Sequence, residues 1–241
     1  MPVTNSTIHI LRSDATKSAE PRFVSFEVPH DEDMTVLDAL LWIQDNLNGT
    51  VAFRYSCRGA VCGSCAMVIN GDIGLACRTH LRDLPAEIFL EPLPNMPIEK
   101  DLVVDMTQFW ESWVRVKPYL MRHDEMPEEE TLQTPAEFDR IEQYINCILC
   151  ACCYSACPLQ QRNPEYMGPA ALAALARFEN DNRDQRGDDS LKDVSHDSGI
   201  WGCRSVFRCI DVCPRAVRPA DGIAELRIKA VKSLFRKKKR R

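Results

Sequence analysis

The sequence lacks any long hydrophobic run. No stretch reaches the roughly 18 apolar residues that would cross a bilayer, and the densest apolar segment, Val36 to Ile43, is short and interrupted by Asp38. A secretory signal is also missing, because residues 1–11 show no basic start followed by an apolar run. We therefore expect a soluble or peripheral protein that works in a reducing compartment.

Cysteine is too scarce for a disulfide scaffold. Twelve cysteines in 241 residues are about 5% of the chain, whereas disulfide scaffolds usually exceed roughly 8–10% in much shorter chains. In a reducing compartment, clustered cysteines indicate metal ligands instead.

Net positive charge is missing from the body of the chain and is found only at its end. Residues 223–241 contain nine Lys or Arg and one Glu, and the rest contains 21 basic and 34 acidic residues. An acidic body would repel phosphate, so we expect no nucleic-acid partner. A helix would place Ile223, Leu226, Ala230 and Leu234 on one apolar face, and we expect this basic tail near anionic lipid headgroups. A disordered, solubilising end is the alternative.

The first 95 or so residues predict a mixed α/β fold. Thr35 can cap a helix that begins there, with Asp38 completing an imperfect capping box. Asn70-Gly71 tolerates the positive φ angles of a tight hairpin turn. Alternation and β-branched residues predict strands over residues 7–11, 22–28, 66–69, 73–76 and 87–91.

Three prolines between residues 92 and 97 indicate a boundary, which predicts domains over 1–100 and 101–241. Helices dominate the second domain. Thr134, Pro135 and Glu137 predict a helix start, with Phe138, Ile141 and Ile145 following at helical spacing. A second helix is expected over 170–178, and the charged segment 180–189 is expected to be a solvated loop.

The first cysteine group follows the spacing C-x4-C-x2-C-x11-C, which is typical of plant-type two-iron ferredoxins. Two irons and two sulfides need four converging thiolates, of which one loop can supply three. Gly59 and Gly63 permit a tight loop whose backbone amides approach the sulfurs. We therefore predict a [2Fe-2S] cluster on four cysteines: Cys57, Cys62, Cys65 and Cys77.

The second group has the bacterial-type spacing C-x2-C-x2-C-x3-C and is followed by Pro158. In this pattern the fourth cysteine, here Cys157, binds the other cluster. The third group repeats the pattern with one loss, because Val206 stands where the template requires cysteine. The exchange between runs predicts a [4Fe-4S] cluster on Cys147, Cys150, Cys153 and Cys213. It leaves three thiolates, those of Cys157, Cys203 and Cys209, for a [3Fe-4S] cluster.

Zinc is the alternative for these groups, since four thiolates also suit tetrahedral zinc. Zinc sites usually combine two short cysteine pairs, however, and Cys77 has no close cysteine neighbour. His196 lies seven residues before Cys203 and is a further conceivable ligand, although we expect it to be a surface residue. Cys152, between two ligands, is expected to face the core as a small apolar residue.

With these motifs, the chain closely resembles the iron–sulfur subunit of the complex II family, succinate dehydrogenase and fumarate reductase. The resemblance covers nearly the whole chain. The matching segments are Ser56 to Cys65, Leu75 to Arg78, Cys147 to Cys153, Asn163 to Ala170, and Cys209 to Pro214. It implies an α+β protein in which a plant-type [2Fe-2S] ferredoxin (β-grasp) domain precedes an all-α bacterial-type ferredoxin domain.

The resemblance also implies partner subunits and a cellular location. Electrons would pass between the covalently bound FAD of a flavoprotein subunit and quinone, which binds where this subunit meets membrane anchor subunits, with or without haem. The protein would lie on the cytoplasmic face of the bacterial inner membrane. The expected activity is that of succinate dehydrogenase in the tricarboxylic acid cycle, with quinol:fumarate reductase as the alternative, and the dicarboxylate site lies on another chain.

The sequence departs from the mitochondrial type near the expected quinone pocket. Gln161 and Arg162 stand where that type has two tryptophans, and Arg204 stands where it has histidine. Pro158, Gln161, Arg204 and Val206 are candidates for the pocket because they neighbour the three-iron cysteines. Plain packing around the cluster, or contact with another subunit, is the alternative.

Two other functions fit the cysteines. One is a zinc-stapled interaction module without redox activity, which would be colourless where an iron–sulfur protein is brown. The other is an iron–sulfur subunit that serves a different dehydrogenase. Residues that would act as catalytic base or nucleophile are not evident in the sequence, so we expect the chain to position clusters and tune their potentials.

Overall fold

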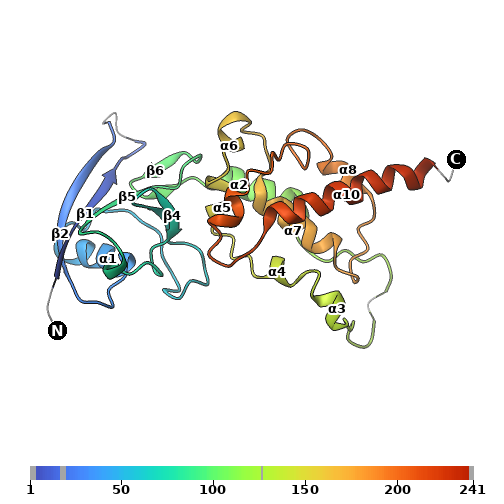
Figure 1. Cartoon of the computed structure of the whole chain (residues 1–241), viewed down its shortest axis with the longest axis horizontal. Coiled ribbons are helices and arrows are strands. Elements are labelled where there is room, and N and C mark those ends of the chain that lie inside the picture. Colours follow the sequence, from blue (N-terminus) through green and yellow to red (C-terminus); the bar gives the residue numbers. More distant parts are fainter. Residues whose placement is uncertain (1–3, 17–19, 126, 239–241) are drawn as a thin grey trace. The chain divides into compact units, whose positions relative to one another are not determined.

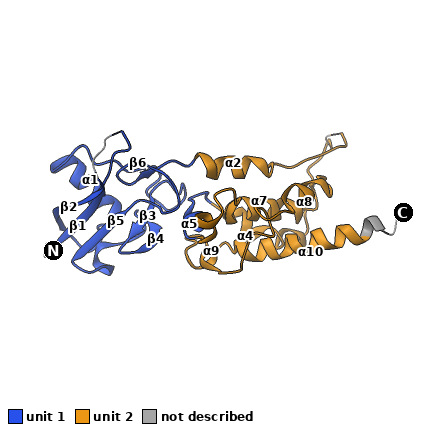
Figure 2. Ribbon diagram, turned by 90° about the horizontal axis from the view of Figure 1, so that it is seen from above, with its two compact units in different colours: residues 1–106, 148–156 blue, residues 107–147, 157–241 orange. Residues whose placement is uncertain are grey.

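The computed structural model describes residues 4–16, 20–125 and 127–238 (Figure 1). The chain divides into two compact units (Figure 2). Unit 1 comprises Met1–Met106 together with Ile148–Ala156, and unit 2 comprises Thr107–Cys147 and Cys157–Arg241. The segment Ile148–Ala156 therefore belongs to the first unit although it lies deep in the second half of the sequence.

Unit 1 is built on a mixed five-stranded sheet in the order β2-β1-β5-β3-β4 (Figure 1). Only the pairing of β1 with β5 is parallel among the named strands of this sheet, and its other three pairings are antiparallel. The strands are β1 (Thr4–Arg12), β2 (Arg22–His30), β3 (Ala66–Ile69), β4 (Asp72–Leu75) and β5 (Glu87–Glu91). A small second sheet pairs β6 (Ile98–Lys100) with β7 (Val103–Val104).

Helix α1 (Val36–Asn46) begins where its cap predicts. The Thr35 side chain accepts a hydrogen bond from the backbone N–H of Asp38 at 3.2 Å, and the Asp38 carboxylate accepts one from the backbone N–H of Thr35 at 3.0 Å. Asp38 therefore completes the capping box despite its short side chain. The core of unit 1 contains apolar side chains from α1 and the sheet that are at most 1% exposed: Ile8, Ile10, Leu37, Leu40, Ile43, Ile88 and Leu90.

Asp101 ties three segments of unit 1 together from a buried position. Its side chain is 2% exposed and accepts hydrogen bonds from Arg12 Nε at 2.9 Å and from the backbone N–H groups of Ser13 at 3.1 Å and Ala52 at 2.9 Å. A buried carboxylate is tolerated only with such partners. The end of β1, the segment after α1 and the β6–β7 turn are thereby held together.

Unit 2 consists of helices packed around α7 (Gly168–Glu179), which lies beside α10 (Pro219–Lys238) (Figure 2). Gly222 permits this approach, because a Cβ there would lie 2.9 Å from the Ala176 Cβ. The other helices of unit 2 are α2 (Thr107–Arg115), α3 (Pro135–Phe138), α4 (Glu142–Ile145), α6 (Leu159–Arg162), α8 (Asp189–Val194) and α9 (Arg208–Asp211). Within residues 4–16, 20–125 and 127–238, no helix is long and apolar enough to cross a membrane.

The helix predicted to run from Thr134 towards Cys147 is broken in two. Thr134 and Glu137 form the expected capping box, but α3 ends at Phe138 and α4 begins at Glu142. Ile141 is fully buried, whereas Phe138 is 43% and Ile145 is 48% exposed. The three residues therefore do not share one buried face, which is why their spacing predicts the helix wrongly.

The prediction of a solvated loop over 180–189 is also wrong. The side chain of Asp181 has no exposed surface and pairs with Arg183 at 2.8 Å and Arg177 at 3.4 Å. Arg186 pairs with Asp184 at 2.8 Å and donates a hydrogen bond to the Tyr119 carbonyl at 2.9 Å. Charged residues so close in sequence are here a buried ion-pair network, which anchors the chain after α2.

Asp181→Asn should destabilise unit 2 by about 3 kcal/mol, because it removes a fully buried carboxylate from two partly buried arginines, Arg177 and Arg183. Burial alone would raise the pKa of Asp181, but hydrogen bonds from Arg183 and the charges of Arg183 and Arg177 outweigh burial and lower it. The carboxylate's stabilisation is therefore complete above the unfolded-state pKa of about 3.9 and is lost as the pH falls through the lower folded-state value.

Denaturant unfolding at neutral and acid pH measures this effect, with exposed Asp193→Asn as the control. The difference between Asp181→Asn and the wild type should shrink in acid. A difference that is unchanged at low pH, or no larger than that of the control, would contradict the buried network.

Candidate metal centres

The loop between α1 and β3 directs backbone amides at the sulfur of Cys57. This Sγ accepts N–H groups from Gly59 at 3.4 Å, Val61 at 3.3 Å and Cys62 at 3.2 Å. The Sγ of Cys62 accepts the N–H of Cys57 at 3.5 Å. Such N–H···S bonds stabilise negative charge on sulfur, so the loop is already shaped to present thiolates.

Left-handed backbone makes this convergence possible. Arg58 (φ 55°) and Ala60 (φ 56°) adopt positive φ on either side of Gly59, a conformation that costs non-glycine residues roughly 1 kcal/mol or more. Alternating such residues turns successive N–H groups to the same side of the chain. The strain is concentrated where the loop surrounds Cys57.

The remaining thiols of the first group lie close together. Burial alone would raise the pKa of the Cys62 thiol, but hydrogen bonds from the backbone of Cys57 and from Ser64 outweigh burial and lower it to about 6. Burial, followed by interactions with the Cys77 and Cys62 thiols, raises the pKa of Cys65 to about 12. The backbone carbonyl of Cys65 also accepts the N–H of Ala76 at 3.0 Å, which fastens the segment that carries Cys77 to the loop.

Gly63 brings this loop against the second cysteine group within unit 1. A Cβ on Gly63, whose φ is +74°, would lie 2.7 Å from the Cys150 Cβ and 2.9 Å from the Ile148 carbonyl oxygen. No side chain fits there. A second link is the hydrogen bond that Asn95 Nδ2 donates to the Ser155 carbonyl at 2.7 Å.

The segment around Cys150 contains a thiol that is not a candidate ligand. Cys152 is fully buried, as predicted. A hydrogen bond from its side chain is the largest cause of a lowered pKa at Cys150, about 7, and backbone N–H groups add to it. Cys152 therefore also acts on its neighbour electrostatically, which its sequence position does not indicate. Cys150 and Cys153 belong to unit 1, and Cys147 and Cys213 belong to unit 2.

The run 203–213 repeats the backbone of the run 147–157. Cys150 and Val206 hold equivalent positions, each flanked by two left-handed residues, and a short helix begins after the second of these in both runs: α5 (Cys152–Ser155) and α9 (Arg208–Asp211). The flanking residues are Leu149 (φ 55°), Ala151 (φ 63°), Ser205 (φ 54°) and Phe207 (φ 65°). The third run therefore keeps the shape of a cluster loop although valine stands in place of one cysteine.

Cys157, Cys203 and Cys209 line one small pocket in unit 2. Burial, and then the charge of Cys203, raise the pKa of Cys157. Burial and the charge of Cys203 likewise raise the pKa of Cys209 to about 11, although the backbone N–H of Ala220 opposes them. Ser205 donates its N–H to the Cys203 Sγ at 3.4 Å. The three thiols are therefore mutually close and largely shielded from water.

Three of the four quinone-pocket candidates line this pocket, and one does not. Pro158, Arg204 and Val206 line it, and Val206 is 50% exposed. Gln161, on α6, is exposed and does not line it. Phe207 and Arg208 line it too, so the pocket offers two exposed apolar side chains and two exposed cations to the surface.

His196 is turned towards its own loop. Its Nδ1 accepts the N–H of Ser198 at 3.2 Å, and its Nε2 lies 3.1 Å from the Asp193 carbonyl. In the described part of the chain, no three His, Cys, Asp or Glu side chains are arranged to hold a single metal ion.

Two residues that the sequence did not single out support the three-thiol pocket. Tyr166 is 1% exposed and lines it, and burial, followed by the charges of Cys203, Cys157 and Cys209, raises its pKa. Arg227 on α10 donates to the carbonyls of Ile200 at 2.8 Å and Cys203 at 2.5 Å. Neither position carries a spacing signal, because each acts through a contact distant in sequence.

Comparisons with known proteins agree with these loops. Residues 7–111 match the family of 2Fe-2S iron-sulfur cluster binding domains, and residues 143–217 match that of 4Fe-4S dicluster domains. The fold is similar to that of a chain in the structure of the Mycobacterium smegmatis Sdh1 complex in the apo form. The TM-score is 0.87 at 21% identity, and the match covers 97% of this chain and 98% of that one.

Relatives match nearly the whole chain. The fumarate reductase iron-sulfur subunit of Mycobacterium tuberculosis is 44% identical over 90% of this chain and 89% of its own. That of Escherichia coli is 40% identical over 96% of this chain and 95% of its own. The succinate dehydrogenase iron-sulfur subunit of Coxiella burnetii is 38% identical over 92% of this chain and 95% of its own.

The fold and the thiol loops thus define an iron–sulfur electron-transfer protein, in which a plant-type ferredoxin domain precedes a helical bacterial-type one. The chain belongs to the family of iron–sulfur subunits of succinate dehydrogenases and fumarate reductases. It carries a [2Fe-2S], a [4Fe-4S] and a [3Fe-4S] cluster. The family, fold class and cofactors that the sequence predicts are confirmed.

Gly63→Ala should destabilise unit 1 and disturb the [2Fe-2S] cluster, because its methyl group would collide with Cys150 as well as strain the backbone. Gly71→Ala is a matched control, since Gly71 has φ +85° and no atom lies within 4 Å of the place that its methyl group would take. The control should lower the free energy of unfolding by about 1–2 kcal/mol through backbone strain alone. Gly63→Ala should lower it by several kcal/mol more.

Chemical unfolding together with the two-iron electron paramagnetic resonance (EPR) signal measures both effects. Equal losses of unfolding free energy and of two-iron signal in the two variants would mean that the close approach of Gly63 to Cys150 does not constrain residue 63.

Proposed function

We propose that this chain conducts electrons between the FAD of a flavoprotein subunit and quinone at membrane anchor subunits, with or without haem. Its relatives are named subunits of succinate dehydrogenase and fumarate reductase, which supports a place in a multi-subunit complex. The proposed location is the cytoplasmic face of the bacterial inner membrane. The observation that carries the proposal is the series of three thiol loops in one chain.

The first proposed ligand set is Cys57, Cys62, Cys65 and Cys77 for the [2Fe-2S] cluster. Its support is the convergence of backbone N–H groups on two of these sulfurs. Those N–H groups stabilise thiolate charge and thereby tune the reduction potential. When bound, each cluster supplies one-electron redox chemistry, and the chain supplies position, shielding and hydrogen bonds.

The other two sets follow from the exchange of the fourth cysteine between runs. Cys147, Cys150, Cys153 and Cys213 would hold the [4Fe-4S] cluster. Cys157, Cys203 and Cys209 would hold the [3Fe-4S] cluster, which is supported by their shared pocket and by the repeated backbone around Val206. Because the repeat keeps its shape, the missing thiol is the principal difference between the loops.

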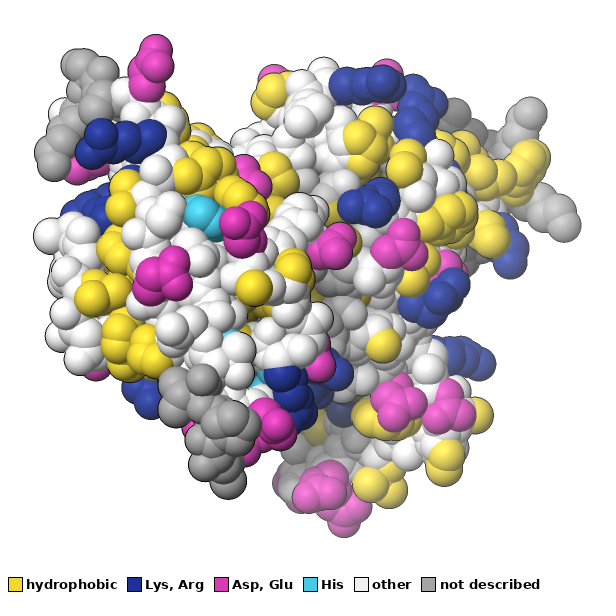
Figure 3. Space-filling view, turned by 60° about the vertical axis from the view of Figure 1, so that its left-hand side comes forward, with side chains coloured by type: hydrophobic (Ala, Val, Ile, Leu, Met, Phe, Trp, Pro, Cys, Tyr) yellow, Lys and Arg dark blue, Asp and Glu magenta, His cyan; other side chains and the backbone are white. Residues whose placement is uncertain are grey.

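Quinone contact is proposed at the mouth of the three-thiol pocket, with Pro158, Arg204 and Val206 as candidates. Gln161 is a weaker candidate because it lies outside that lining. On the face shown in Figure 3, acidic and basic side chains of the described residues are interspersed among hydrophobic ones. Such a mixture differs from the continuous basic surface that nucleic-acid backbones require, so we propose no nucleic-acid partner.

Succinate oxidation is the first proposed direction, as a succinate:quinone oxidoreductase of the tricarboxylic acid cycle. Fumarate reduction is the second, and two observations favour it. Relatives at 44% and 40% identity carry the name fumarate reductase, and Gln161 and Arg162 replace the tryptophan pair of the mitochondrial type. Rates of succinate oxidation and fumarate reduction by the purified complex, measured with matched quinone and quinol, distinguish the two.

The cluster assignment is tested by EPR of the anaerobically purified complex, first as isolated and then reduced with dithionite. A three-iron signal in the oxidised state, replaced by two-iron and four-iron signals on reduction, is the expected result. Iron without a three-iron signal would overturn the ligand assignment. A partner subunit that lacks covalent FAD would indicate a different dehydrogenase.

Val206→Cys should convert the three-iron site into a four-iron site, because it restores the thiol at a position whose backbone already has the required shape. EPR of the oxidised protein should show the three-iron signal reduced several-fold. Val206→Ala is the control, since it changes the same position without adding a thiol. A three-iron signal of equal strength in both variants would show that the template does not apply.

A further inference from the structure

The C-terminal half of α10 has a second apolar face that the body of unit 2 leaves uncovered. Ile223, Leu226 and Ala230 are at most 5% exposed and pack into the core. Leu234, expected on that same face, is instead 68% exposed. The prediction fails there because the covered face of the last turns passes through Ser233, which is 6% exposed, and leaves Leu234 outside that face.

Four large apolar side chains form this outer stripe. Their exposed fractions are 55% for Ile228, 40% for Val231, 68% for Leu234 and 67% for Phe235. At 3.6 residues per turn, the four lie within about 120° of the helix circumference. A stripe of this width on one helix is typical of a surface that is covered in the working molecule.

The charges around the stripe have one sign. Lys232 is exposed beside it, and the sequence continues with six consecutive basic residues, 236–241. Acidic residues are missing from 226–241. A run of basic residues without acidic ones complements a continuous layer of lipid phosphates.

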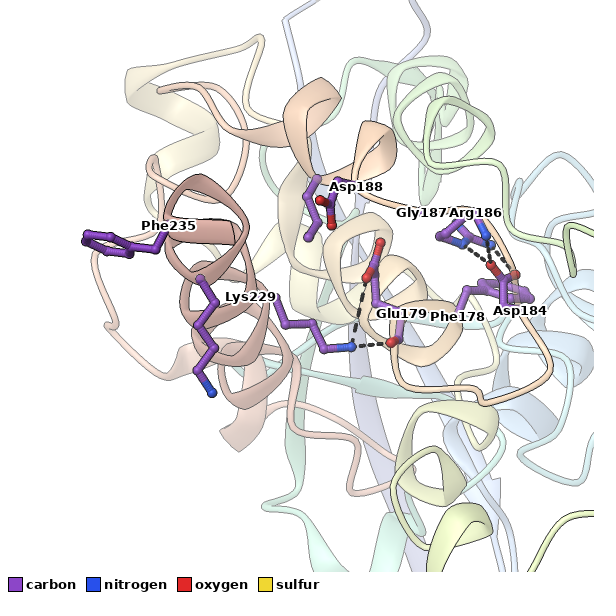
Figure 4. A pocket seen from close by; sticks show the side chains of 10 residues that line it. Phe178, Glu179, Asp184, Arg186, Gly187, Asp188, Lys229 and Phe235 are labelled. Atoms are coloured by element: carbon purple, nitrogen blue, oxygen red, sulfur yellow. Dashed lines mark hydrogen bonds and ion pairs between the residues drawn. The ribbon is translucent and has the colours of Figure 1, made fainter. Parts of the chain in front are cut away.

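The nearby pocket does not compete for this role. It measures about 610 Å³ and lies between α7, the start of α8 and α10 (Figure 4). Lys229 donates to the Glu179 backbone carbonyl, with Nζ 3.9 Å from the carboxylate, and Arg186 is paired with Asp184. Its inner charges are thus satisfied. Phe235 and Lys232 also line this pocket, and Phe235 points away from the Lys229–Glu179 pair (Figure 4).

We propose that the stripe of Ile228, Val231, Leu234 and Phe235, together with the basic end of the chain, binds an anionic bilayer surface directly. The apolar side chains enter the boundary between headgroups and acyl chains, and the Lys and Arg side chains contact lipid phosphates. This contact depends on α10 alone and holds whichever way electrons flow.

Flotation of the purified, cluster-loaded chain with vesicles tests the proposal. Vesicles of phosphatidylcholine with phosphatidylglycerol should bind the wild type, and binding should fall at high salt and with phosphatidylcholine alone. The double variant Leu234→Ser, Phe235→Ser should lose about tenfold or more in affinity for the anionic vesicles. Leu132→Ser is the control, because Leu132 is 79% exposed elsewhere in unit 2.

Unchanged cluster absorption verifies that the variants are folded. Equal binding by the double variant and the control would overturn the role of the stripe. A second outcome would also overturn the role of the stripe. If the double variant binds vesicles as well as the wild type but no longer assembles with its partner subunits, the stripe is a protein interface.

A second, independent observation concerns Tyr166. Its hydroxyl is buried, and among the described residues no nitrogen or oxygen atom forms a hydrogen bond with it, although buried hydroxyls normally have a partner. The same ring lines the pocket of Cys157, Cys203 and Cys209. Cys203, which lines the same pocket, is the side chain with which this hydroxyl interacts most directly.

We infer that the Tyr166 O–H donates a hydrogen bond to a sulfur of the three-iron site and raises its reduction potential. The inference rests on the proposed ligand set. Hydrogen bonds to cluster sulfurs are an established means of setting potential. Tyr166 is in this role a positioning and tuning residue, with no part in the reaction at the dicarboxylate.

Redox titration followed by EPR measures the midpoint potential of the three-iron signal. Tyr166→Phe should lower that potential, while Tyr144→Phe, which removes another buried hydroxyl of unit 2, should leave it unchanged. A three-iron signal with the same potential in both variants overturns this inference and leaves the ligand set intact. No three-iron signal in the wild type overturns the ligand set and the inference with it.

Discussion

The structure depends on how backbone N–H groups are turned towards cysteine sulfur. Left-handed residues at alternate positions shape all three loops, around Gly59, Cys150 and Val206. This conformation is unfavourable for residues with a side chain, so the surrounding packing must hold it. The two-iron loop is supported by Gly63 against the Cys150 segment, and the three-thiol loop by Arg227 from α10. Cluster loops are therefore local in sequence, but their shape is maintained by contacts from far away.

Much of the fold was predictable, because its signals are local. Capping at Thr35 and Thr134, the Asn70-Gly71 turn and strand alternation each depend on neighbours within a few residues. The cysteine spacings are of the same kind, and they carried the family and the cofactors. The grouping of the thiols was predictable for this reason, whereas the ligand sets themselves stay a proposal.

What the sequence did not indicate involves long-range contacts. The segment around Asp181 looks solvated because its residues are charged, yet the partners that bury it come from α7 and from the chain after α2. Leu234 fits the periodicity of a buried face, but the neighbouring Ser233 occupies the covered face instead. Tyr166 becomes notable only when three thiols from separate segments surround it. In each case the residue's environment is set by segments that are distant in the sequence, so neighbouring residues do not reveal it.

The membership of Ile148–Ala156 in unit 1 bears on how the protein matures. Gly63 lies against this segment, so the first iron–sulfur loop lacks one of its walls until more than half of the chain has been synthesised. During translation, that loop leaves the ribosome well before the residues that enclose it. The two-iron centre is first in the sequence, yet its loop gains this neighbour only after residues 148–156 have been made, and a chain truncated before them would leave Gly63 without it.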